Sequence, residues 1–106
     1  MPLESKFQAE LRRELEQLYP GCLILKQDAN YLQGIPDLLI LWDGRWAALE
    51  CKKSATAAHR PNQDYYIAMM NEMSFAAFVY PENRDEVLDA LQQSFRPRRQ
   101  ARISQR

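Results

Sequence analysis

The apolar residues of this chain recur with two different periods, which predict helices in some segments and strands in others. Between residues 3 and 18 the apolar side chains are three or four positions apart and form one stripe of a helix. The members of this stripe are Leu3, Phe7, Leu11, Leu15 and Leu18. Pro20 and Gly21 end the helix. Short apolar runs between turn residues then predict strands at residues 22–27 and 74–80.

The middle of the chain has the pattern of a β-hairpin. Residues 38–42 form an unbroken apolar run, which is typical of a central strand covered on both faces. Asp43 and Gly44 are a turn signal, and a second strand follows at residues 46–51. The sequence therefore predicts two antiparallel strands joined by a tight turn.

The second half of the chain predicts a helix, a strand and a last helix. Pro61 can open the first of these helices, and Gln63 and Met70 follow on the side that faces the sheet. The methionines of this helix are most simply interpreted as core packing. Asn83 and Glu86 resemble a capping box at the start of the last helix. The predicted order is helix, three strands, helix, strand, helix, which is an α/β arrangement.

The composition is that of one ordinary globular domain. The chain has 106 residues, of which 46% are hydrophobic and 26% charged. No apolar run approaches the roughly 20 residues that span a bilayer, and the N-terminus enters a helix rather than a signal sequence, so we expect no membrane association. The two cysteines have no motif spacing, which favours a reducing compartment. We therefore expect two free thiols on strands rather than a Cys22–Cys51 disulfide.

The net charge of zero hides an uneven distribution. Residues 1–89 contain nine Lys or Arg and fourteen Asp or Glu, whereas residues 90–106 contain five Arg and no acid. A basic arm on an acidic body fits contact with phosphates. The alternative is a solvated tail that only aids solubility. We expect residues 1–95 to form the folded domain and residues 96–106 to be a basic C-terminal tail.

Three charged residues of the predicted hairpin are candidates for chemistry. Glu50 and Lys52 point to one side of their strand and Cys51 to the other, because side chains alternate along a strand. Asp37 lies near the start of the partner strand, so pairing across the turn brings it beside Glu50. Two close carboxylates raise each other's pKa unless a cation lies between them, and Mg²⁺ is the obvious cation. The alternative is a structural ion-pair cluster, which rarely stabilises a fold.

These residues also carry a family resemblance. The string Gly34-Ile-Pro-Asp37, then Glu50-Cys-Lys52, then Gln63, resembles the Pro-Asp…(Asp/Glu)-x-Lys pattern of the PD-(D/E)XK nuclease superfamily. In particular it is similar to the small phage-type VRR-NUC nucleases, over roughly residues 3 to 91. The resemblance implies a restriction-endonuclease-like αβββαβ core, with a mixed four-stranded sheet flanked by helices. The element order read from hydrophobicity agrees with it.

The resemblance also implies roles for individual residues. Asp37, Glu50, the backbone carbonyl of Cys51 and Glu4 would be ligands of Mg²⁺ or Mn²⁺. Catalysis would use Asp37, Glu50, Lys52 and Gln63, with Lys52 stabilising negative charge. Residue types alone leave alternatives open, since Glu4 also suits the first turn of a helix and Gln63 suits a helix start.

The implied function is a metal-dependent endonuclease that hydrolyses DNA, expected to be specific for branched or four-way-junction DNA. Such a protein would act as a homodimer in the cytoplasm of a bacterial or phage-infected cell. Its expected nucleic-acid contacts are Lys53, Arg60, Arg96, Arg98, Arg99 and Arg102. The alternatives are a non-catalytic nucleic-acid-binding protein on a nuclease-like scaffold, and a nuclease acting on simple duplex, single-stranded DNA or RNA.

Overall fold

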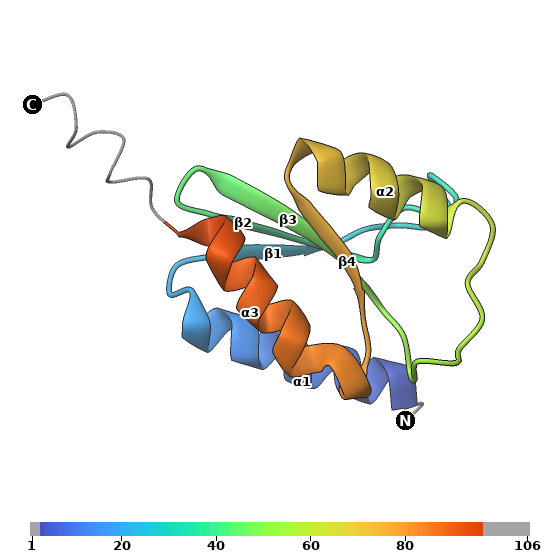
Figure 1. Cartoon of the computed structure of the whole chain (residues 1–106), viewed down its shortest axis with the longest axis horizontal. Helices are drawn as coiled ribbons and strands as arrows, with labels where there is room; N and C mark the ends of the chain where they lie inside the picture. The colour runs from blue at the N-terminus through green and yellow to red at the C-terminus, as the bar shows by residue number, and fades with distance from the viewer. Residues whose placement is uncertain (1–2, 97–106) are drawn as a thin grey trace, which may run out of the picture.

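The computed structural model describes residues 3–96 as one sheet with helices on both faces (Figure 1). The helices are α1 (Leu3–Leu18), α2 (Gln63–Met73) and α3 (Arg84–Phe95), with a short 3₁₀ turn, η1 (Pro81–Asn83), before α3. The strands are β1 (Leu23–Lys26), β2 (Leu38–Trp42), β3 (Arg45–Cys51) and β4 (Phe75–Val79). The mixed four-stranded α/β fold expected from the sequence is confirmed.

The strands lie in the order β1-β2-β3-β4, so each is a neighbour of the strand that precedes it in the chain. β2 is antiparallel to both β1 and β3, whereas β3 and β4 are parallel. The parallel pair requires a crossover, and α2 supplies it. The turn of the hairpin is formed by Asp43 and Gly44, whose φ angles are 52° and 74°. Positive φ at both central residues is what a tight hairpin turn demands.

One face of the sheet packs against α1 and α3 and forms the core. Every fourth position of α1 from Phe7 to Leu15 is buried, as its apolar stripe predicts. The sheet contributes alternate residues of β2 and β3, because only every second side chain faces this way. The buried cluster includes Leu38, Ile40, Ala47, Leu49, Cys51, Val79, Leu88 and Leu91.

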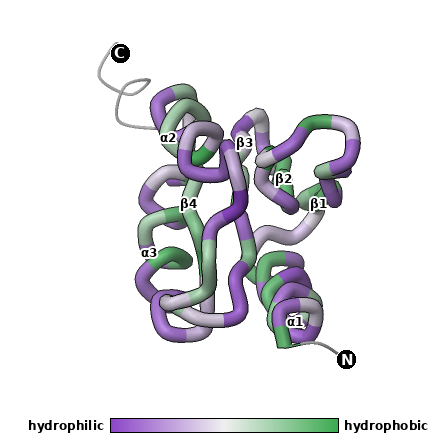
Figure 2. The backbone as a smooth tube through the Cα atoms, turned by 90° about the vertical axis from the view of Figure 1, so that its right-hand side faces the viewer, coloured by the Kyte–Doolittle hydropathy of each residue, from purple (hydrophilic) through white to green (hydrophobic). Residues whose placement is uncertain are grey.

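The other face of the sheet is only half covered. α2 lies over β3 and β4, apart from α1 and α3 (Figure 2). On β1, Leu23 is 54% exposed and Leu25 is 40% exposed, opposite Leu41 and Leu39 of β2 in the register. We call this apolar surface of β1 and β2 the open sheet face. It lies on the side of the sheet away from the core.

Three details of the second half differ from the sequence expectation. α2 begins at Gln63 rather than Pro61, because Asn62 has a left-handed φ of 72° that a helix cannot include. Its residues Ile67, Met69 and Met70 are only half-buried. Met73 is 64% exposed, so the core interpretation of the methionines was wrong for that residue. Asn83 does not pair with Glu86 in a capping box. Its side chain bonds instead to the backbone of Tyr80 and Phe78.

Cys22 and Cys51 are both free thiols. Cys51 is a buried thiol on β3 as expected, whereas Cys22 lies just before β1 and is only half-buried, so the expectation was wrong for Cys22. Burial, followed by the neighbouring carboxylates Asp37 and Glu50, raises the pKa of the Cys51 thiol. Within residues 3–96 no helix has the length and apolar character needed to cross a membrane.

Gly34 provides the first testable prediction. It has a φ of 92°, and a Cβ there would lie 2.5 Å from the Cβ of Asn62. Gly34→Ala therefore combines backbone strain with a collision between the loop before β2 and the loop before α2, and should reduce the free energy of unfolding by about 2–4 kcal/mol. Urea denaturation measures the change.

Gly21→Ala is the matched control for this variant. Gly21 has a similar φ of 85°, but a Cβ there meets nothing within 4 Å. We expect a loss of only about 1 kcal/mol from the backbone conformation. Equal losses in the two variants would show that the contact between the two loops contributes nothing.

Candidate functional site

Asp37 and Glu50 are held against each other by the pairing of β2 and β3. Leu38 pairs with Leu49, so the residues just outside them are also neighbours. The backbone N–H of Asp37 donates to Glu50 Oε1 at 3.1 Å. In return, the N–H of Cys51 donates to Asp37 Oδ1 at 3.2 Å. Each carboxylate thus accepts a bond from the other strand, and both are fixed in position.

The environment of these two carboxylates disfavours their charge. Burial raises the pKa of Asp37 to about 6, against the lowering effect of the bond from Cys51, and the Glu4 carboxylate raises it further. Burial raises the pKa of Glu50 to about 7, and the charge of Asp37 adds to this, while Lys52 acts in the opposite direction. Both carboxyl groups therefore hold their protons to a higher pH than in water, and a bound cation would favour their charged forms.

Lys52 follows β3 and continues its pairing, since its N–H donates to the carbonyl of Val79 at 2.8 Å. Its side chain is buried, and Nζ donates to the carbonyl of Ala58 at 3.1 Å. It lines the same pocket as Glu50, as strand alternation predicted. The ammonium is therefore held in place by the loop between β3 and α2.

Gln63 connects the same loop to the carboxylates. As the first residue of α2 it is buried, and Nε2 donates to Glu50 Oε2 at 3.1 Å. Its Oε1 accepts a bond from the N–H of Arg60 at 2.8 Å. The amide thus has both ends satisfied and orients Glu50 from the side of α2. This places Gln63 next to the carboxylates, as the sequence led us to expect.

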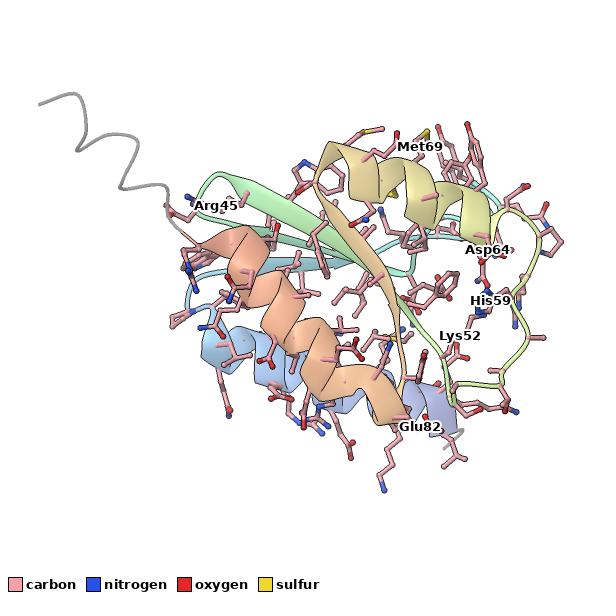
Figure 3. All side chains as sticks on the ribbon, in the orientation of Figure 1. Arg45, Lys52, His59, Asp64, Met69 and Glu82 are labelled. Carbon is pink, nitrogen blue, oxygen red and sulfur yellow. The ribbon has the colours of Figure 1, made fainter. Side chains whose placement is uncertain are left out.

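His59 lies between Ala58, which binds Lys52, and Arg60, which binds Gln63, and it anchors this part of the loop. Its ring stacks on Phe78 with centroids 4.0 Å apart, and Nδ1 lies 2.7 Å from Asp64 Oδ1. Figure 3 shows His59 and Asp64 beside each other at the start of α2, with Lys52 nearby. The sequence offered only a lone histidine, with no signal for this contact. The contact fixes the backbone that carries the Ala58 carbonyl and the Arg60 N–H.

Gln8 is a site residue that the sequence reasoning missed. It lies on α1, and its Nε2 donates to Asp37 Oδ2 at 2.8 Å. The sequence did contain a signal for it, namely the spacing between Glu4 and Gln8. The two residues are four positions apart and so share a helix face. Gln8 and Cys51 together satisfy both oxygens of Asp37.

These side chains line a pocket of about 500 Å³, which we call the carboxylate pocket. Its walls come from α1, the loops before β2 and α2, and the end of β3. Glu4 and Arg60 are among the lining residues, while Lys53 lines a hollow that adjoins it. The structure therefore brings Glu4, Asp37, Glu50, Lys52 and Gln63 to one place, although they come from four separate segments.

The donor set of the carboxylate pocket fits Mg²⁺ or Mn²⁺. Within residues 3–96, no three His, Cys, Asp or Glu side chains are grouped so that they could hold a metal ion by themselves. Mg²⁺ does not need such a group, because it is usually held by one or two carboxylates together with waters and substrate phosphates. The side chain of Cys51 lies in the core, so only its backbone carbonyl remains as a candidate ligand. Glu4 as a ligand stays a prediction.

Arg96, which belongs to the described residues, does not lie at this pocket. Arg96 follows α3, whose last residue, Phe95, stacks on Trp42 with centroids 5.9 Å apart. Trp42 is at the hairpin end of β2, and Asp37 is at the other end. Arg96 thus follows an end of α3 that lies at the opposite end of the sheet from the carboxylates, and Figure 1 shows this end of α3 beside the turn between β2 and β3. Arg98, Arg99 and Arg102 lie outside the described residues, and their contact with nucleic acid stays a prediction.

Comparison with known proteins identifies a relative in structure rather than in sequence. No family model matches the sequence, and no curated protein matches it. A solved structure titled "VRR_NUC domain protein" superposes with a TM-score of 0.62 at 18% identity, covering 90% of this chain and 89% of that one. At this identity the likeness establishes the fold and extends over nearly the whole of both chains. The chain has the fold of a VRR_NUC domain protein, and Asp37, Glu50 and Lys52 line the carboxylate pocket of this fold.

Proposed function

We propose that this protein is a VRR-NUC-type nuclease that uses Mg²⁺ or Mn²⁺ to hydrolyse phosphodiester bonds in DNA. The observation that carries the proposal is the pair of interlocked carboxylates, Asp37 and Glu50, with Lys52 in the same pocket. A buried carboxylate pair with raised pKa values is costly to a fold and is typical of a functional site. The fold shared with a VRR_NUC domain protein makes this chemistry the best-supported one.

The protein residues have separate roles in this proposal. Asp37 and Glu50 would hold the metal, which when bound would make a water more acidic and offset charge on the phosphate. Gln8 and Gln63 keep the two carboxylates oriented through their bonds to Asp37 and Glu50. Lys52 supplies a positive charge in the same pocket, where it can stabilise negative charge on the attacked phosphate. Its bond to the Ala58 carbonyl holds the ammonium ready without neutralising it.

The presence of all three charged residues argues against a non-catalytic scaffold. A protein that only binds nucleic acid has no use for two buried carboxylates, which repel phosphates. We propose branched or four-way-junction DNA as the substrate, because the described residues form one sheet with its helices and include no separate domain that would read sequence. The protein can be incubated with four-way junction, flap, duplex, single-stranded DNA and RNA, in the presence of Mg²⁺, Mn²⁺ or EDTA. This distinguishes a nuclease specific for branched DNA from one that acts on simple duplex, single-stranded DNA or RNA. Cleavage that survives EDTA would contradict the role of the metal.

We also propose that two copies form a homodimer, which supplies the two symmetric cuts that a junction requires. The open sheet face is the apolar surface that supports this, together with Tyr31, which is 89% exposed. Trp42 does not contribute to this surface, because it packs against Tyr19 and Phe95 on the core side of the sheet. For such a nuclease we propose the cytoplasm of a bacterial or phage-infected cell as the site of action.

Asp37→Asn should abolish cleavage and at the same time stabilise the metal-free protein at pH 8. The folded-state pKa of Asp37 is about 6, above its usual value, so the folded protein binds more protons than the unfolded one between about pH 4 and 6. Wild-type stability therefore falls as pH rises through this window, and the neutral Asn avoids the loss. Its side chain can still accept from Cys51, and Gln8 can rotate its amide to accept from Asn.

We expect Asp37→Asn to gain at least about 1 kcal/mol over wild type at pH 8 and less near pH 4, measured by urea denaturation in EDTA. Asp43→Asn is the control, since Asp43 lies in the exposed hairpin turn at the other end of β2. That variant should keep its activity. A variant at Asp37 that cleaves DNA at the wild-type rate with Mg²⁺ would eliminate this carboxylate from the site.

Lys52→Ala should lower kcat by roughly 10²–10³ with little change in DNA affinity, because the ammonium acts on charge that develops during the reaction. Lys52→Arg should recover only part of the rate, since a planar guanidinium does not fit the place of a compact ammonium bonded to the Ala58 carbonyl. Single-turnover kinetics and a binding titration measure the two quantities. Loss of affinity with unchanged turnover would identify Lys52 as a phosphate anchor instead.

The dimer can be tested at the open sheet face. Leu23→Ser with Leu25→Ser should convert a dimer into a monomer in sedimentation velocity, because both leucines would lose apolar contact with the second copy. Leu18→Ser is the control, as Leu18 is 46% exposed but lies on α1. A wild-type chain that sediments as a monomer at high concentration would contradict the dimer.

A further inference from the structure

The carboxylate pocket continues into a groove across the molecule. A second hollow of about 570 Å³ shares Glu4, Ser5, Lys52 and Arg60 with it. A third, of about 310 Å³, shares Leu3 and Lys53 with the second. Because each hollow shares residues with the next, the three adjoin in a row from the loop before β2, past the first turn of α1, to η1 and the start of α3, and we call this row the groove.

The far end of this path collects positive charge from three separate segments. Lys6 on α1, Lys53 after β3 and Arg84 at the start of α3 all line the third hollow, with Glu10 as the acidic residue there. Lys6 and Lys53 are exposed, and neither forms a salt bridge with another residue of the described part of the chain. Arg84 is held in place by Glu14, to which its Nε donates at 2.8 Å.

Folding gives a reason for the position of Arg84, which pairs with Glu14, but none for the two lysines. Neither Lys6 nor Lys53 forms an ion pair with another described residue, and neither is part of the buried core. Positive groups that meet in a groove attract a polyanion and raise its local concentration. Lys53 also follows Lys52 directly in sequence, and both line the middle hollow. A ligand that contacts Lys52 in the carboxylate pocket is therefore within reach of Lys53 as well.

We propose that this groove holds the sugar-phosphate backbone of the substrate on one side of the scissile phosphate. Lys6, Lys53 and Arg84 would contact successive phosphates, independent of base sequence. The inference rests on the proposed nuclease function and adds to it the course of the bound strand. It also separates the groove from Arg96, which follows the end of α3 that packs on Trp42 at the hairpin end of the sheet.

The test compares two double variants that remove the same charge. Lys6→Ala with Lys53→Ala removes two cations from the groove, whereas Arg12→Ala with Arg13→Ala removes two exposed cations from α1 that line none of the three hollows. Arg84 is left unchanged, because its removal would leave Glu14 without its partner. Fluorescence anisotropy of labelled duplex and junction DNA in EDTA measures affinity without cleavage, over a series of salt concentrations.

We expect the groove variant to bind about tenfold or more weakly at low salt, with the slope of log K against log salt reduced by about two. The control variant should keep nearly the wild-type slope. Equal effects of the two variants would overturn the groove, because only total charge would then matter, and so would an unchanged slope in the groove variant. A wild-type chain that binds no DNA would overturn the proposed function itself, which is a separate and distinguishable result.

Discussion

The reciprocal bonds between Asp37 and Glu50 are the constraint on which the rest of the site depends. Each carboxylate accepts the backbone N–H of the opposite strand, so the pairing of β2 and β3 and the placement of the two charges are one arrangement. A shift in register by one residue would turn the side chains to the other face and separate them. The apolar residues of β2 and β3 that face the core resist such a shift, since they would lose their burial.

Around this pair, the fold supplies one supporting contact from each side. α1 brings Gln8 to Asp37, and α2 brings Gln63 to Glu50. The loop between β3 and α2 holds the ammonium of Lys52 through the Ala58 carbonyl. His59 fixes that loop by stacking on Phe78, the residue that lies opposite Glu50 on β4. The candidate catalytic groups are thus oriented by neighbours whose own positions are set by packing.

The site also has a cost for the fold. Buried carboxylates with raised pKa values are less stable in their charged form than they would be in water. The core on the other face of the sheet, where Leu38, Leu49 and Val79 are fully buried, offsets this cost. A divalent cation would relieve the repulsion directly. Function and stability therefore make opposite demands on the same two residues, which is common at catalytic sites.

The sequence by itself determined the elements, the hairpin and the neighbourhood of Asp37 and Glu50. These follow from local rules, because hydrophobic period defines helices and strands, and a two-residue turn sets which residues pair across it. The start of α2 could not be predicted from these local rules. Pro61 is a good first residue for a helix, but Asn62 adopts a left-handed conformation where its loop meets Gly34.

Only the tertiary structure decided which distant residues complete the site. Gln8, the Ala58 carbonyl and His59 support it because of how α1 is placed and how one loop runs. The spacing of Gln8 from Glu4 indicates a shared helix face, but only packing decides that this face meets Asp37. The groove of Lys6, Lys53 and Arg84 likewise joins three segments that are far apart in the chain. Such contacts depend on the packing of whole elements, whose relative positions are set by the complete core rather than by any short stretch of residues.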